Sequence, residues 1–156
     1  MTELITHRGP DSDGFYRDDK INMGFRRMSI IDLQAGDQPV YNEDRTLVLN
    51  FNGEIYNYQE LREELIEKGH TFYTKTASEV LVHGFEEWGE KMLDRLRGMF
   101  GFAIYNKKDG SVFLVRDFFG IKPMHYMHVN GHFVYGSEIK SLLAFPGFEK
   151  KFNEHS

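Results

Sequence analysis

LNFNGEIYN, residues 49–57, follows an apolar run that begins at Thr46 and is typical of a β-strand. We predict that this strand breaks at Asn52-Gly53, where a side-chain amide adjoins a residue without a Cβ atom. The pair can direct a carboxamide N–H and a backbone N–H at one oxygen atom, which is the donor arrangement of an oxyanion hole. Asn-Gly is also the strongest short signal for a hairpin turn. No alternating strand follows, which favours a functional corner over a plain turn.

Helices are predicted directly after this corner. Asn57 has the features of an N-cap, and Glu60 three residues later would complete a capping box. Thr76 and Glu79 repeat that pattern at the start of a second helix. The predicted helices cover residues 58–68, the apolar-faced segment after Thr76, and residues 91–97.

The rest of the chain is predicted to be mostly β-structure. Two hairpins are expected, one pairing residues 99–106 with 111–116 and one pairing 124–128 with 132–136. Ser137 is expected to cap a last helix over residues 138–145. The remaining expectations are a helix end at residues 1–6, a turn-rich loop at 7–14 and a strand at 21–31. Consecutive antiparallel pairs with grouped helices indicate an α+β fold in which helices cover antiparallel sheets.

Two adjacent arginines lie in the strand predicted over residues 21–31. Strand alternation directs Arg26 and Arg27 to opposite faces, so one of them must point toward the better-buried side. A buried guanidinium needs an anionic partner. A salt bridge to Asp32 or Asp117 and a clamp on a ligand carboxylate are equally good explanations at this point.

The composition of the chain limits the classes of function that it can have. At 156 residues the chain is one domain in size, and a formal charge of −5 disfavours broad nucleic-acid binding. No apolar run is long enough to span a membrane, and no secretory signal is visible, so a cytoplasmic location is the default expectation. The sequence contains no cysteine, which excludes disulfides, thiolate metal ligands and a cysteine nucleophile among these residues.

Several familiar catalytic and metal-binding motifs are missing from the sequence. It contains no glycine-rich phosphate loop, no Gly-x-Ser-x-Gly elbow and no His-Glu-x-x-His motif. His125 and His128 are three residues apart on a predicted strand and hence on opposite faces, so they are poor metal partners. No metal site is predicted.

Three ordered motifs carry a resemblance to a known family: HRGPD at residues 7–11, RRMSIID at 26–32 and NGEIYN at 52–57. They closely resemble the class II glutamine amidotransferase domain. The blocks LRGMF at 96–100, RDFFGIKP at 116–123 and GSEIKSLL at 136–143 resemble the asparagine synthetase branch in particular. The resemblance runs over nearly the whole chain and implies a four-layer αββα sandwich of mostly antiparallel sheets, the fold of the N-terminal-nucleophile hydrolases.

The resemblance implies roles for individual residues. Such domains hydrolyse the side-chain amide of glutamine and pass ammonia to a second, ATP-using synthetase domain. By resemblance, the Asn52 side chain and the Gly53 N–H form the oxyanion hole, and Arg27 clamps the substrate α-carboxylate. Glu54 and the backbone near Ile31 help to hold the amino acid. No cofactor is expected in this domain, because ATP and magnesium belong to the synthetase domain.

The sequence departs from the family pattern in two places. The family nucleophile is a cysteine on an N-terminal strand, so this sequence is expected to lack that strand and most of the first helix. Ala77 stands where the family has the aspartate that holds the substrate ammonium, a loss worth a few kcal/mol of binding. Removal of Met1 would expose Thr2 as another N-terminal nucleophile, but it lies where the family has helix. We expect no catalysis by these residues alone.

Two functions therefore compete. One is the glutaminase domain of an asparagine synthetase, over residues 1–148, with residues 149–156 starting a linker to a synthetase domain. The other is a non-catalytic module that binds a ligand or a protein through the remnant pocket. The expected partners are glutamine and the synthetase domain, with no nucleic acid or membrane. A missing inner strand would open a sheet edge that a homodimer or a partner segment could close.

Overall fold

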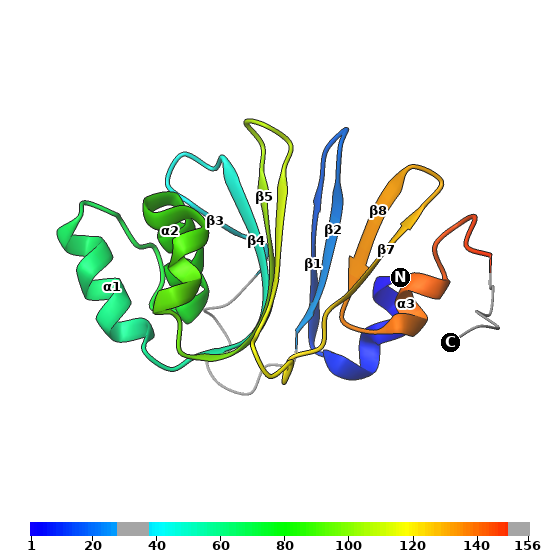
Figure 1. Ribbon diagram of the computed structural model, residues 1–156, viewed down its shortest axis with the longest axis horizontal. Helices are drawn as coiled ribbons and strands as arrows, with labels where there is room; N and C mark the ends of the chain where they lie inside the picture. Colours follow the sequence, from blue (N-terminus) through cyan, green and yellow to red (C-terminus); the bar gives the residue numbers. More distant parts are fainter. Residues whose placement is uncertain (28–37, 150–156) are drawn as a thin grey trace.

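The computed structural model describes residues 1–27 and 38–149, which form four layers (Figure 1). The first layer is helical, the second is a four-stranded sheet, the third contains two separate hairpins, and the fourth is again helical. The first layer consists of α1 (Tyr58–Glu67), α2 (Ala77–Trp88) and the 3₁₀ helix η2 (Gly89–Arg95). The fourth consists of the 3₁₀ helix η1 (Thr2–Arg8) and α3 (Ile139–Leu143). The αββα order predicted from the sequence is confirmed.

The four-stranded sheet is antiparallel throughout. Its order is β3 (Val40–Tyr41), β4 (Leu47–Ile55), β5 (Gly98–Asn106) and β6 (Val112–Arg116). The prediction that the strand breaks at Asn52-Gly53 is wrong, because β4 stays paired with β5 as far as Ile55. Gly53 has a φ of +148° and lies opposite Phe100. Only glycine adopts that conformation easily, so the residue keeps the ladder continuous instead of ending it.

The third layer contains two hairpins that do not pair with each other in the described part of the chain. These are β1 (Ser12–Arg17) with β2 (Asn22–Arg27), and β7 (His125–Val129) with β8 (His132–Gly136). β1 begins within the segment predicted as a turn-rich loop. Tyr16 explains the strand, since its ring packs 6.0 Å from that of Tyr105 in the first sheet. The predicted strand at 21–31 is confirmed as far as Arg27, and its later residues lie outside the described chain.

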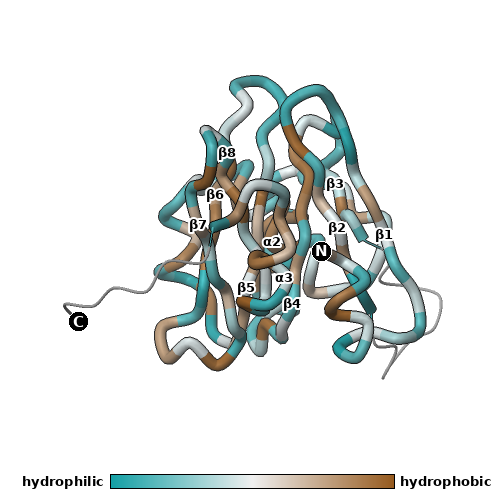
Figure 2. The backbone as a smooth tube through the Cα atoms, turned by 90° about the vertical axis from the view of Figure 1, so that its right-hand side faces the viewer, coloured by the Kyte–Doolittle hydropathy of each residue, from teal (hydrophilic) through white to brown (hydrophobic). Residues whose placement is uncertain are grey.

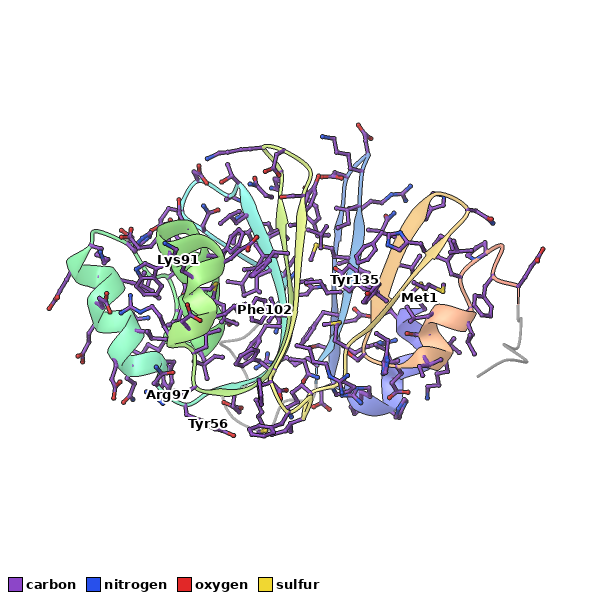
Figure 3. All side chains as sticks on the ribbon, viewed as in Figure 1. Met1, Tyr56, Lys91, Arg97, Phe102 and Tyr135 are labelled. Carbon is purple, nitrogen blue, oxygen red and sulfur yellow. The ribbon has the colours of Figure 1, made fainter. Side chains whose placement is uncertain are left out.

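The apolar core is divided by β4 and β5. Phe51 and Phe102 belong to the helix-side core, which lies between the sheet and α1 and α2. Figure 3 shows Phe102 on that side and Tyr135 among the strands of the third layer. Met23, Val48 and Ala103 belong to an inter-sheet core between the two β layers. Figure 2 shows hydrophobic stretches along the strands and hydrophilic residues in many of the connecting loops, which lie at the surface.

The helices begin close to the predicted positions, but their caps differ from prediction. Asn57 precedes α1, yet its side chain donates to the Arg95 carbonyl at 2.9 Å and accepts the Arg97 N–H at 3.0 Å. The predicted capping box between Thr76 and Glu79 is replaced by other contacts. The Glu79 carboxylate accepts hydrogen bonds from the N–H groups of Tyr73 and Thr74 at 2.7 and 2.6 Å. Both side chains satisfy backbone groups of neighbouring loops, which have no ladder partner of their own.

The C-terminal helix also differs from prediction. α3 covers Ile139–Leu143, which is shorter than expected, and Glu138 rather than Ser137 occupies its N-cap position. The Glu138 carboxylate contacts η1, lying 2.8 Å from His7 Nε2 and 3.4 Å from Arg8 Nη1. These contacts join the two helical elements of the fourth layer. No helix among the described residues is long and apolar enough to cross a membrane.

Candidate functional site

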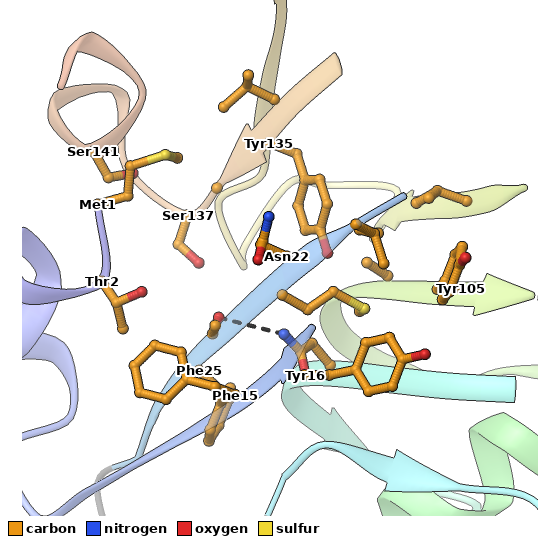
Figure 4. Close-up of a pocket in the computed structure, with 18 of the residues that line it drawn as sticks. Met1, Thr2, Phe15, Tyr16, Asn22, Phe25, Tyr105, Tyr135, Ser137 and Ser141 are labelled. Atoms are coloured by element: carbon orange, nitrogen blue, oxygen red, sulfur yellow. Dashed lines mark hydrogen bonds between the residues drawn. The ribbon is translucent and has the colours of Figure 1, made fainter. Parts of the chain in front are cut away.

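A cavity of about 820 Å³ lies between the two hairpins of the third layer and reaches the inner face of the first sheet (Figure 4). It is bounded by β2, by β8, by the middle of β4 and β5, and by η1. Polar groups from four elements border it: Arg8, Arg26, Asn52 and Tyr135. Thr2, the alternative nucleophile, also lines this cavity, at the start of η1 rather than on a strand.

Two asparagines of β4 face the cavity, and their environments differ. Asn50 and Asn52 share the inner side of β4 because side chains two residues apart point the same way. The Asn50 carboxamide donates to the Gly24 carbonyl at 3.3 Å and so connects β4 to β2 (Figure 4). The Asn52 carboxamide makes no hydrogen bond within the described part of the chain. It is therefore available to a ligand.

The other residues selected from the sequence lie apart from the cavity lining. Gly53 is half-buried in the β4 ladder, and Glu54 beside it is exposed. Ala77 is the first residue of α2 and packs against the helix-side core. Arg27 ends β2, where its carbonyl accepts the Asp11 N–H at 3.1 Å. Of the predicted set, Asn52 alone borders the cavity among the described residues, and Ile31 lies outside them.

Arg26 is a cavity residue that sequence reasoning did not select. It lies opposite Asp13 in the β1–β2 ladder, with Nη1 3.5 Å from Asp13 Oδ2. Its Nε is buried and has no hydrogen-bond partner in the described structure. The sequence predicted that one of the two arginines would need an anion, and among the described residues Arg26 has only this long contact to a half-exposed carboxylate. Its adjacency to Arg27 was the only available signal.

Asp117 is not the salt-bridge partner that was weighed for the arginines. Its Oδ1 accepts the Ile121 N–H at 2.9 Å, and its Oδ2 accepts the N–H groups of Lys122 and Phe100 at 2.9 and 3.2 Å. Burial raises the pKa of this carboxyl, but the backbone donors together outweigh burial and lower the pKa. Asp117 thus shapes the connector between β6 and β7, leaving the Phe118 ring exposed.

Tyr135 is a second cavity residue that no sequence motif indicated. It projects from β8 into the cavity beside Asn22 (Figure 4). Its hydroxyl is buried without a hydrogen-bond partner among the described residues, and burial raises its pKa. Buried polar groups are normally paired, so an unpaired hydroxyl facing a cavity marks a place for a polar partner.

Comparison with known proteins identifies the family. The family model described as "Glutamine amidotransferase domain" matches residues 1–156. The chain belongs to this family. The amidotransferase domain is similar to asparagine synthetase [glutamine-hydrolyzing] 1 of Bacillus subtilis (strain 168), with 50% identity over 144 residues, covering 92% of this chain and 23% of that protein. It is also 41% identical over 143 residues to asparagine synthetase [glutamine-hydrolyzing] of Zea mays, covering 91% of this chain and 24% of that protein.

A solved structure supports the fold of this amidotransferase domain. Glutamine phosphoribosylpyrophosphate amidotransferase from B. subtilis superimposes with a TM-score of 0.60 at 21% identity, covering 73% of this chain and 27% of that chain. At that identity the likeness concerns the fold. The chain spans about a quarter of the length of the curated relatives that it matches.

Proposed function

We propose that this amidotransferase domain binds glutamine where Asn52 of β4 borders the cavity, with Asn52 and Gly53 as the oxyanion hole. Hydrolysis of an amide passes through a tetrahedral intermediate whose oxygen becomes negative, and donors held in place for that oxygen lower the barrier. The observation that carries the proposal is the Asn52 carboxamide, which faces the cavity and makes no hydrogen bond within the described chain.

The substrate carboxylate requires a cation, and the proposed clamp is Arg27, the residue that matches the family motif. The structure adds Arg26 as a competitor, since its buried Nε lacks a partner among the described residues and it lines the cavity. Replacing each arginine by lysine separates the two, because lysine keeps the charge but loses the planar two-pronged donor set. The residue that clamps the carboxylate will be the one whose lysine variant binds glutamine more weakly.

The nucleophile of the reaction is proposed to lie outside these 156 residues, because they contain no cysteine. In the longer relatives, which are asparagine synthetases, the matching region accounts for about a quarter of the chain. We therefore propose that released ammonia is delivered to an ATP-using synthetase domain of the full-length protein. These residues alone then bind glutamine without turning it over.

A non-catalytic ligand-binding module is the second candidate, and Ala77 favours it. In the family an aspartate at this position pairs with the substrate ammonium. An alanine offers the ammonium no partner, so glutamine affinity falls while the rest of the pocket stays intact. The two candidates differ in whether supplying a nucleophile restores turnover.

Calorimetric titration of glutamine into the purified chain tests the proposal, with ammonia release followed in the same sample. We expect weak binding and no turnover. Asn52→Ala should abolish the binding, while Asn50→Ala is the matched control, because Asn50 is bonded to Gly24 and is not a proposed donor. Equal loss in both variants would contradict the assignment of Asn52, and ammonia release by the unmodified chain would contradict the missing nucleophile.

A further inference from the structure

Four potential metal ligands meet on the helical side of the first sheet, away from the cavity. They are Glu43 between β3 and β4, His70 after α1, and His83 and Glu86 on α2. One ligand atom from each lies within 4.8 Å of the others. His83 and Glu86 are three residues apart in α2 and therefore share one face of the helix. Three separate chain segments thus converge on one point.

His83 is the observation that points to a ligand. Its side chain has no exposed surface, yet neither ring nitrogen makes a hydrogen bond in the described structure. Nδ1 lies 3.1 Å from Glu43 Oε2, but the angles at these atoms do not allow a hydrogen bond. Leaving a buried polar group unpaired destabilises the fold. A cation placed between Nδ1 and the carboxylate would remove that cost, because it accepts electron pairs from both.

Carboxylates also lie near the far ring nitrogen of each imidazole. Nε2 of His83 faces Glu79 Oε1 at 3.8 Å, and Nε2 of His70 faces Glu87 Oε2 at 3.5 Å. His70 Nδ1 shares a hydrogen bond with Glu43 Oε1 at 3.2 Å, so a bound cation would take the place of that proton. Histidines that bind metals in proteins commonly donate their far ring N–H to a carboxylate, and closer approach of Glu79 and Glu87 would provide that contact.

Charge and spacing favour a divalent ion of the zinc type. Among the described residues neither Glu43 nor Glu86 has a lysine or arginine partner, so with neutral histidines the four ligands carry two negative charges. His70 Nδ1 is 3.2 Å from Glu43 Oε1 and 3.9 Å from Glu86 Oε2. Tetrahedral Zn²⁺ with bonds of about 2.0–2.1 Å places its ligand atoms roughly 3.4 Å apart. Small side-chain movements would therefore complete the site.

We propose that Glu43, His70, His83 and Glu86 bind one Zn²⁺ ion that joins the β3–β4 connection to α1 and α2. Four protein ligands leave no open coordination position, which is the pattern of structural zinc rather than catalytic zinc. The partly exposed carboxylates of Glu43 and Glu86 give the ion a route from solvent. None of the four ligands lines the cavity that Asn52 borders.

The test uses the chain without a polyhistidine tag, freed of metal by a chelator and then of chelator by dialysis. Zn²⁺ is titrated by calorimetry at pH 7.5, and Co²⁺ is titrated in parallel to read coordination geometry from its visible absorption. We expect one equivalent of Zn²⁺, the intense visible bands of tetrahedral Co²⁺, and a higher melting temperature with metal.

Variants decide which residues hold the ion. Because replacement of fully buried His83 could unfold the chain, His70→Gln and Glu86→Gln are used, and each should weaken Zn²⁺ binding by about tenfold or more. His128→Gln, at an exposed histidine of β7, is the matched control and should bind as the parent does. Failure to bind one equivalent, or equal binding by all three variants, would overturn the proposal and leave a cluster of carboxylates and histidines without a metal role.

Discussion

Gly53 packs against the backbone of Met99 so closely that a Cβ atom at residue 53 would lie 2.1 Å from the Met99 carbonyl oxygen. The same residue has a φ of +148°. Two independent constraints therefore require glycine beside the Asn52 carboxamide. As a consequence, β4 is continuous, and Asn52 borders the cavity at the position where β4 pairs with Gly101 of β5.

Gly53→Ala should lower the free energy of unfolding by at least about 2 kcal/mol, because it adds both steric overlap and backbone strain. Gly131→Ala is the matched control, since Gly131 has a φ of +78° but, its two chain neighbours aside, no described residue has an atom within 4 Å of the place that its Cβ would occupy. The control should cost only about 1 kcal/mol. Urea unfolding of the parent chain and of the two variants measures both losses of stability. Equal losses would show that overlap with Met99 is relieved by backbone movement.

Ala77→Asp should increase glutamine affinity by about tenfold or more, because it returns an anion to pair with the substrate ammonium. Ala77→Asn has nearly the same volume without the charge and should bind glutamine as the parent does. Since Ala77 is the first residue of α2, the aspartate also interacts favourably with the helix N-terminus. Calorimetry for affinity and urea unfolding for stability distinguish these effects. A gain in stability without a gain in affinity would place the ammonium elsewhere.

Tyr135→Phe should leave stability unchanged or raise it by about 1 kcal/mol, because the hydroxyl it removes is buried without a partner in the described structure. Tyr16→Phe is the comparison, since the Tyr16 hydroxyl donates to Asp18 Oδ2 at 2.9 Å. That variant should lose about 1 kcal/mol. Thermal or urea unfolding gives both values. A marked loss on Tyr135→Phe would mean that this hydroxyl is paired in solution.

Asp117→Asn should lower the melting temperature at pH 7 by several degrees, because the amide nitrogen would face backbone N–H groups that now reach a carboxylate. The pKa of Asp117 is lowered in the folded state, so the ionised carboxylate contributes stability above its unfolded pKa of about 3.9. That contribution disappears as the pH falls through the folded pKa.

The difference in melting temperature between the parent and Asp117→Asn should therefore be largest near pH 6 and should decrease toward pH 3. Thermal melts across that range measure it. Asp94→Asn, at an exposed position of η2, should show little difference at any pH. A gap between parent and Asp117→Asn that is constant with pH would show that the carboxylate charge is not what stabilises the connector.

Local sequence signals predicted much of the fold. The two hairpins from Gly98 to Gly136 and the starts of α1 and α2 agree with the structure, because turn residues and apolar periodicity act over a few neighbouring positions. β1 was missed because turn-forming residues dominate its sequence, and Tyr16 becomes informative only when packed on another layer. Asn57 and Glu79 were assigned to local caps, but Asn57 bonds the Arg95 carbonyl 38 residues away and Glu79 bonds the loop that precedes α2.

By itself, the sequence determined the family and, through that resemblance, the αββα layers. Only the tertiary structure decided that Arg26 and Tyr135 border the same cavity as Asn52, and that Glu43 lies 3.2 Å from His70 across 27 residues of chain. The propensity for helix or strand depends on neighbouring residues in the chain. Whether a buried polar group has a hydrogen-bond partner depends instead on which layers of the fold pack against it. Both candidate sites consist of such groups, brought together by packing between segments far apart in the chain.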